Sequence, residues 1–244
     1  MLSRTIARLH KDYVTYRNDG VPFPLESVIA WYVLLALQEQ RTIRGNIMEM
    51  GVEHGGTAFL GTVALREDEH IDLIDLKKSP RFAKVAERLP TALASRVHFH
   101  ECSTRAPELA EIAKQLFRFV HIDAGHSKQD VLDDIGRFAG CVAPDGILCL
   151  DDVFEIRWPG VTEAIFEAIP STGLVPFLLV NRKLYLAHKD MAGVYRDMLV
   201  AALPEIEVFG NMRHWTEEML GGVTLIWKQA LRTTDLNLLL PSTA

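Results

Sequence analysis

Three aspartates and one histidine stand at positions where they could do chemistry together. Asp123 directly follows one apolar run, Asp151 and Asp152 directly follow the next, and His126 comes three residues after Asp123. Carboxylates that are brought together repel one another unless a cation lies between them. Their oxygens suit Mg²⁺, Mn²⁺ or Ca²⁺ rather than zinc. His126 has an ordinary pKa near neutrality and could accept the proton of a substrate hydroxyl as a general base.

The two apolar runs, Phe119–Ile122 and Ile147–Leu150, are predicted to be neighbouring strands. Between them lie an amphipathic helix and a Pro-Asp-Gly turn at Pro144–Gly146. A crossover of this length makes the two strands parallel. The carboxyl ends of parallel strands meet at one rim of the sheet, where open α/β sheets bind ligands. Alternatively, the aspartates only cap a turn and a helix, and His126 only caps the helix or faces solvent. Of the two interpretations, the metal site is favoured, because three acids follow adjacent strand ends.

The rest of the chain alternates strand and helix patterns. Further strands are predicted at Asn46–Met50, Ile71–Leu76, Val97–His100, Leu174–Val180 and Lys183–His188. Helices are predicted at Thr57–Leu65, Arg81–Leu89, Pro107–Leu116, Gln129–Phe138 and Thr162–Ile169. Strand–helix units followed by an antiparallel hairpin predict an α/β fold with a doubly wound mixed sheet. His98 and His100 alternate with apolar residues, which indicates the polar side of a strand.

A glycine-rich loop follows the first predicted strand, which is a typical nucleotide-binding arrangement. The dinucleotide fingerprint needs glycine at its first, third and sixth positions. Gly51 and Gly56 match the first and sixth, but Glu53 occupies the third, where its charge would repel a pyrophosphate. S-adenosylmethionine has no phosphate, and its cationic sulfonium would be attracted by Glu49 or Glu53. The alternative is that these glycines only turn the chain.

Two further polar residues are predicted at the same rim. Asp75 ends the second predicted strand, about 24 residues after Gly51, which is the usual place for an acid that binds a ribose. Ser103 follows the third strand and could contact an adenine ring. These positions strengthen the prediction of an adenosine-containing cofactor.

Composition limits the class of protein and its partners. The chain has 244 residues, a formal net charge of −6 and 48% hydrophobic residues, so either one large domain or one domain with a small cap fits. The acidic balance argues against nucleic acid and favours a small-molecule or protein partner. Three cysteines without a CxxC pair suggest a reduced, cytoplasmic location. The longest apolar run, Val28–Leu37, is shorter than the roughly 20 residues that span a membrane.

The glycine loop resembles the first motif of class I S-adenosylmethionine-dependent methyltransferases. The matching pattern is Glu49-x-Gly51-x-x-x-Gly55-x-Thr57. The later motifs, from His121 through Asp123 to His126 and then Leu150-Asp151-Asp152, resemble a narrower group. That group includes macrocin O-methyltransferase and related enzymes that methylate sugar hydroxyls on natural products. Metal-dependent catechol-type enzymes share the same layout.

The resemblance covers roughly residues 45–190 and implies a fold and a site. It implies a Rossmann-like, seven-stranded mixed sheet in the order 3-2-1-4-5-7-6, with the last strand antiparallel. It implies that S-adenosylmethionine is bound by Glu49, Gly51, Glu53, Gly55, Thr57, Asp75, Ser103 and Asp123. It also implies a divalent metal ion, Mg²⁺ first among the candidates, on Asp123, Asp151 and Asp152.

Two positions depart from the patterns of these groups. Some sugar methyltransferases carry an Asp that acts as the catalytic base, two residues after the first metal-binding Asp. In this chain that position is Gly125. The role of catalytic base then passes to His126, with Asp123 as the second catalytic residue, or the position of the base is left vacant. Catechol-type enzymes usually have Asn after the second metal-binding Asp, and here that residue is Asp152.

The chain is predicted to divide into three parts: a helical cap or oligomer segment over residues 1–45, a cofactor-binding core over 46–190, and an extension over 191–244. The predicted helix Leu25–Gln38 is apolar almost all round, which indicates a buried cap or a contact in a homo-oligomer. The expected function is magnesium-dependent O-methyl transfer to a sugar or glycosylated natural product. The alternatives are a catechol-type enzyme, an NAD-linked oxidoreductase and a non-catalytic cofactor-binding scaffold.

Overall fold

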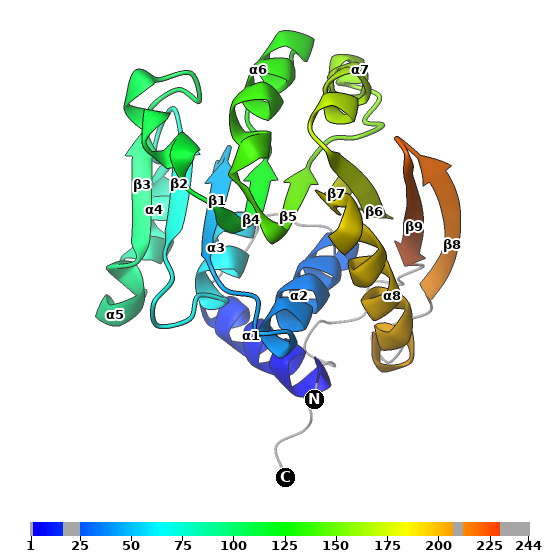
Figure 1. Cartoon of the computed structure of the whole chain (residues 1–244). Helices are drawn as coiled ribbons and strands as arrows, with labels where there is room; N and C mark the ends of the chain where they lie inside the picture. The colour runs from blue at the N-terminus through cyan, green and yellow to red at the C-terminus, as the bar shows by residue number, and fades with distance from the viewer. Residues whose placement is uncertain (1, 17–24, 207–211, 230–244) are drawn as a thin grey trace.

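A single mixed sheet forms the centre of the protein. The computed structural model describes residues 2–16, 25–206 and 212–229. Within these ranges nine strands pair in the order β3-β2-β1-β4-β5-β7-β6-β9-β8 (Figure 1). They are β1 Asn46–Met50, β2 Ile71–Asp75, β3 Val97–Glu101, β4 Phe117–Ile122, β5 Val142–Leu150, β6 Leu174–Val180, β7 Lys183–His188, β8 Met212–Met219 and β9 Gly222–Gln229. The first seven strands have the predicted order, with β7 antiparallel to β5, so the Rossmann-like fold is confirmed.

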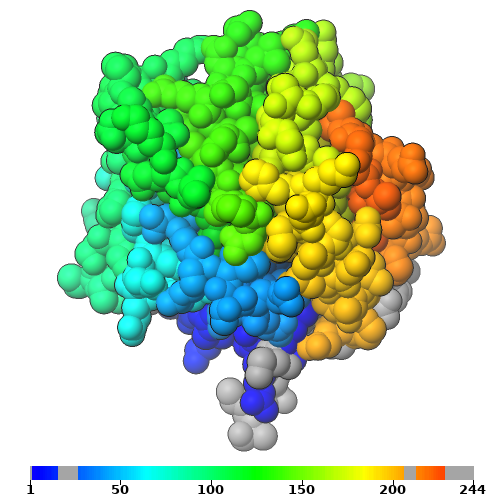
Figure 2. Space-filling model, viewed as in Figure 1, coloured from blue at the N-terminus to red at the C-terminus, as the bar shows by residue number. Residues whose placement is uncertain are grey.

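The expectation of seven strands was wrong, because a C-terminal hairpin adds β8 and β9. β9 lies parallel to β6, and β8 pairs antiparallel with β9. Alternate residues of β9, Leu225 and Trp227, are each only 1% exposed. Their burial next to α8 explains why this apolar run joins the sheet instead of remaining a separate tail. Figure 2 shows the hairpin, in orange, beside the yellow α8.

Helices cover both faces of the sheet, as a doubly wound fold requires. They are α1 Leu2–Tyr16, α2 Leu25–Gln40, α3 Gly56–Val63, α4 Pro80–Ala86, α5 Thr91–Ala94, α6 Lys128–Phe138, α7 Pro159–Ala168 and α8 Lys189–Ile206. One core joins α1, α2, α3 and α8 to one face of the sheet. A second core joins α6 and α7 to the other face. None of the described helices is both long and apolar enough to cross a membrane.

Helix α2 is buried inside the single chain. No residue from Val28 to Leu37 is more than 4% exposed, because α1, α3, α8 and the sheet surround the helix. Its all-round apolar character therefore reflects cover by this chain's own elements. Of the two interpretations of this helix, the burial of Val28–Leu37 fits the cap, and the homo-oligomer stays a prediction.

Two local predictions were also wrong. Residues Pro107–Leu116 form two short 3-10 segments, η1 Pro107–Ala110 and η2 Ile112–Lys114, instead of one α-helix. The two buried apolar residues there, Leu109 and Ile112, are three apart, and that spacing suits a 3-10 helix with three residues per turn. The Pro-Asp-Gly sequence lies within β5, where the register between β5 and β4 shifts. The predicted turn is therefore an irregularity inside the strand.

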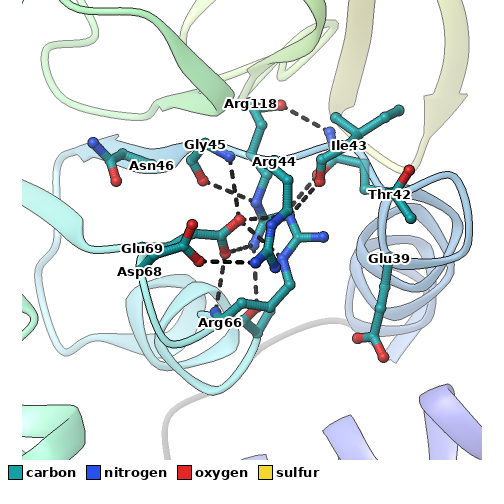
Figure 3. A network of polar contacts seen from close by, with 12 residues as sticks. Glu39, Thr42, Ile43, Arg44, Gly45, Asn46, Arg66, Asp68, Glu69 and Arg118 are labelled. Atoms are coloured by element: carbon teal, nitrogen blue, oxygen red, sulfur yellow. Dashed lines mark hydrogen bonds and ion pairs between the residues drawn. The ribbon is translucent and has the colours of Figure 1, made fainter.

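Arg118 is a buried cation at the opposite end of the sheet from the strand-end aspartates. Its side chain, only 2% exposed, donates to Gln38 Oε1 at 2.7 Å and to Glu69 Oε2 at 3.1 Å. It also donates to the backbone carbonyls of Gly45 and Ala64, both at 3.1 Å (Figure 3). One guanidinium thus ties together the end of α2, the start of β1, the end of α3 and β4.

Candidate functional site

A cavity of about 960 Å³ opens at the carboxyl rim of the sheet. It lies over the ends of β1, β2, β4 and β5 and the turn between β6 and β7, where the sequence placed the site. The predicted site residues that line it are Gly51, Glu53, Thr57, Asp75, Ser103, Asp123, His126, Asp151 and Asp152. Glu49 and Gly55 are absent from the lining. The structure therefore brings most of the predicted residues to one cavity and places these two behind its wall.

Gly51 is required by a close approach of two backbones. Its φ is +83°, and a Cβ built on it would lie 1.9 Å from the carbonyl oxygen of Asp123. Only glycine fits both the left-handed conformation and this contact. The crossing holds the end of β1 against the end of β4, so that Asp123 faces the same cavity as the glycine loop.

Asp75 holds the glycine loop in shape. Its Oδ2 accepts hydrogen bonds from the backbone N–H groups of Val52 and Glu53, both at 2.8 Å. Its Oδ1 accepts one from Lys77 N at 3.3 Å. The acid predicted to bind a ribose therefore stands at the cavity and also fixes the loop opposite it.

Glu49 lies beneath the cavity, fully buried. Its Oε1 accepts a hydrogen bond from Thr57 Oγ1 at 2.5 Å and lies 3.7 Å from His121 Nδ1. Its Oε2 has no hydrogen-bond partner among the described residues. Gly55, with φ +86°, precedes α3 and packs against Phe59 and Phe82. Both residues shape the cavity wall from behind.

His126 lies between two of the aspartates. Its Nε2 is 3.1 Å from Asp152 Oδ2 and 3.9 Å from Asp123 Oδ1. The ligand atoms of these three residues lie within 4.8 Å of one another. A second such set, His121, Asp123 and Asp151, shares Asp123 with the first. The three predicted metal ligands thus occupy one rim, arranged as two overlapping groups.

Lys183 is a site residue that the sequence interpretation missed. Its ammonium forms an ion pair with Asp151 and lies 3.1 Å from His121 Nε2, although the side chain is only 4% exposed. Arg182, the preceding residue, lies 3.5 Å from Asp152. A signal was available: β7 runs antiparallel to β5, so the first residue of β7 must lie near the end of β5.

The ionisation of the aspartates follows their surroundings. Burial raises the pKa of Asp123 to about 6, against the opposing hydrogen bond from His126. Burial and the charge of Asp151 raise the pKa of Asp152. For Asp151 burial also opposes ionisation, but the charge of Lys183 brings its pKa below the usual range. The protein's own cations thus offset Asp151 well, and Asp123 and Asp152 incompletely.

The loop after β5 forms an apolar lip beside His126. The Trp158 ring stacks on the His126 ring, with centroids 4.8 Å apart and planes 14° apart. Phe154 and Ile156, on the same loop, are 55% and 90% exposed. Large apolar side chains that are exposed together are unusual unless they contact a ligand or partner. The sequence interpretation did not identify this lip.

Comparison with known proteins agrees with the geometry. Residues 48–153 match a family model described as a methyltransferase domain. No curated protein sequence matches the chain. Among solved structures, calicheamicin methyltransferase CalS11 is similar with a TM-score of 0.50 and 16% identity, over 77% of this chain and 93% of that chain. A further structure of CalS11, described as a TDP-rhamnose 3'-O-methyltransferase, has a TM-score of 0.49 and 16% identity, over 77% and 94% of the two chains.

A second enzyme, MycE methyltransferase of the mycinamycin pathway in complex with Mg, S-adenosylhomocysteine and mycinamycin VI, is similar with a TM-score of 0.51 and 15% identity. The match covers 75% of this chain and 54% of MycE. At these identities the solved structures establish the fold alone, and the match to the methyltransferase domain extends from β1 to just past the end of β5. The chain therefore carries a match to a methyltransferase domain over residues 48–153, and its fold is that of the methyltransferases CalS11 and MycE.

Proposed function

We propose that the chain transfers the methyl group of S-adenosylmethionine to a hydroxyl of a sugar or glycosylated natural product. The observation that carries this proposal is His126, placed between Asp123 and Asp152 at the rim of the cavity. An imidazole among carboxylates is a suitable acceptor for the proton of a hydroxyl. The descriptions of CalS11 and MycE, which name a rhamnose 3'-O-methyltransferase and a complex with mycinamycin VI, support the same class of acceptor.

The cofactor is assigned to the half of the cavity beneath the glycine loop. Gly51, Glu53 and Thr57 line it on one side, and Asp75 and Ser103 on the other. Glu53, in place of the second glycine of the dinucleotide fingerprint, disfavours a pyrophosphate and suits a cationic sulfonium. This half of the cavity is therefore better matched to S-adenosylmethionine than to NAD.

The rim residues fit a divalent cation. Asp123 and Asp152 have raised pKa values, so the carboxylate charge there is incompletely offset by the protein's own cations. Their oxygens, with Asp151 beside them, are ligands that Mg²⁺ accepts. A cation bound there would lower the pKa of the acceptor hydroxyl and orient it. Lys183 keeps Asp151 ionised and in place before any cation binds.

His126 is assigned the role of the base. The acceptor oxygen attacks the methyl carbon, the carbon–sulfur bond breaks in line, and S-adenosylhomocysteine leaves with the electron pair. The hydroxyl proton passes to Nδ1 of His126, because Nε2 is engaged by the carboxylate of Asp152. The Trp158 ring stacked on His126 and the carboxylate of Asp152 hold the imidazole in one orientation, which is the positioning that such a displacement needs.

The lip at the cavity mouth favours an acceptor with an apolar body. Trp158 lines the cavity, and Phe154 and Ile156 expose apolar surface on the same loop. A hydroxyl-bearing sugar would meet the aspartates, while an attached apolar skeleton would cover the lip. This observation favours a glycosylated natural product over a free sugar.

The cofactor assignment is tested by calorimetric titration of the full chain with S-adenosylhomocysteine and, separately, with NAD. We expect micromolar binding of S-adenosylhomocysteine and much weaker binding of NAD, because the charge of Glu53, which lines the cavity, would repel a pyrophosphate. Tighter binding of NAD would contradict the assignment and favour an oxidoreductase.

The metal assignment is tested by Mg²⁺ titration and by methyl transfer to a panel of glycosylated macrolides. We expect Asp123→Asn to remove Mg²⁺ binding and transfer while binding of S-adenosylhomocysteine changes little. Asp145→Asn, at the other end of β5, is the matched control and should retain Mg²⁺ binding. Full methyl transfer in excess EDTA would refute a role for the metal ion. Lys183 would then be the positive charge that balances the aspartates at the rim.

A further inference from the structure

A second group of possible metal ligands lies outside the cavity, on strands β2 and β3. His70 directly precedes β2, Asp72 lies within β2, and His98 and His100 lie within β3. The parallel register pairs Asp72 with His98 and Ile74 with His100. Because side chains alternate between the faces of a strand, the three histidines and Asp72 project from the same face. None of them lines the cofactor cavity.

The side chains of this group are in mutual contact. Asp72 Oδ2 lies 3.1 Å from His70 Nε2, and Asp72 Oδ1 lies 2.8 Å from His100 Nε2 and 3.6 Å from His98 Nδ1. The rings of His70 and His98 lie with centroids 4.7 Å apart. The ligand atoms of His70, Asp72 and His98 fall within 4.8 Å of one another. A tetrahedral zinc ion separates neighbouring ligand atoms by roughly 3.3 Å, so small side-chain rotations would suffice.

The carboxylate of Asp72 is buried without an arginine or lysine partner in the described part of the chain. Asp72 is 3% exposed, yet in the described part of the chain its ion-pair partners are only histidines. Glu69 is paired with Arg66 and Arg118, and Asp151 with Lys183. Buried charges in proteins are paired with an opposite charge or coordinate a metal. A divalent cation held by the histidines and Asp72 would supply that opposite charge at this group.

We propose that His70, Asp72 and His98 bind a zinc ion, with a water molecule as the fourth ligand. Two imidazoles and one carboxylate suit zinc rather than magnesium. His100 holds the Asp72 carboxylate and acts as a positioning residue. The side chain of His98 is 47% exposed, so the ion can enter from solvent. The ion ties the edge strand β3 to β2, the strand that carries Asp75 into the cofactor cavity.

The test uses the full chain, stripped of metal and titrated with Zn²⁺ by calorimetry and with Co²⁺ by visible absorption. We expect one tight ion per chain and the strong absorption bands of four-coordinate cobalt. His98→Ala should remove both, and His100→Ala should weaken zinc binding by about 10–100-fold. His214→Ala, which removes an exposed histidine from β8, is the matched control and should change neither.

The acidic rim could also attract zinc, so the same titration is made on Asp123→Asn. Tight zinc binding that persists in Asp123→Asn and disappears in His98→Ala supports the proposal. Binding that disappears in Asp123→Asn and persists in His98→Ala overturns it, as does the absence of tight binding in the natural chain. Because His98 is an exposed position, its replacement is not expected to unfold the chain, and circular dichroism checks this.

Discussion

Replacement of Arg118 by methionine is expected to lower the free energy of unfolding by about 3–5 kcal/mol, as the breaking of a buried ion pair does. The substitution leaves the Glu69 carboxylate, only 2% exposed, without one of its two cations, and removes the hydrogen bonds to Gln38, Gly45 and Ala64. Urea denaturation measures the change. Arg44→Met is the matched control, because Arg44 and Asp68 form an exposed pair in the same region (Figure 3), worth about 1 kcal/mol or less.

The free energy of unfolding measured at acidic pH tests the ion pair between Arg118 and Glu69 a second time. Burial alone would raise the pKa of Glu69, but Arg66 and Arg118 lower it to about 2, from an ordinary value of 4.5. A carboxylate with a lowered folded pKa stabilises the fold above its unfolded pKa, and this contribution is lost as the pH falls toward 2. Arg118→Met should therefore flatten the loss of stability between pH 4.5 and 2. An equally steep acid limb in the variant would show that Arg118 does not hold this carboxylate ionised.

His126→Ala is expected to slow methyl transfer by roughly 10²–10⁴-fold, the usual loss when a general base is removed. Binding of S-adenosylhomocysteine should change little, because the base contacts the acceptor and not the adenosine. The rate is measured with saturating cofactor and an accepted glycoside, and His214→Ala serves again as the control. A His126→Ala enzyme that transfers methyl groups at the natural rate would show that another residue at the rim accepts the proton.

The pH profile gives a second measure of the same role. The contact with Asp123 and the charges of Asp152 and Asp151 raise the pKa of His126 above 6.5. Since the base must be neutral, the rate should rise with pH through this raised pKa and then level off. Asp123→Ala, assayed by its residual rate, should move the rise to lower pH. A profile that stays flat through the neutral range would contradict the assignment.

The sequence predicted the strand-end acids because their positions depend only on local patterns. Asp123, Asp151 and Asp152 each follow an apolar strand, and parallel strands necessarily gather their ends at one rim. Lys183 was missed because a lysine after a tight turn is usually exposed, and its burial depends on the pairing of β7 with β5. The contact between Asp72 and His98 depends in the same way on the register of two strands, which no local pattern specifies.

The elements that cover α2 could not be predicted for a different reason. An all-round apolar helix indicates that something covers every side, but the sequence does not say whether the cover comes from this chain or from another copy. Here α1, α3 and α8, from distant parts of the chain, supply it. The β8–β9 hairpin escaped prediction similarly, because Leu225 and Trp227 find their place only against elements that precede them by dozens of residues.

The C-terminal hairpin also decides which strand is exposed to other molecules. Without it, the open edge of the sheet would be β6, whose sequence Leu-Val-Pro-Phe-Leu-Leu-Val is entirely apolar. Unpaired apolar edges invite a strand from a neighbouring molecule to add to the sheet, which starts aggregation. With the hairpin, the edge is β8, where Arg213, Glu217 and Glu218 are exposed. Charges on an edge strand oppose such addition, so the hairpin disfavours strand pairing between two copies of the folded protein.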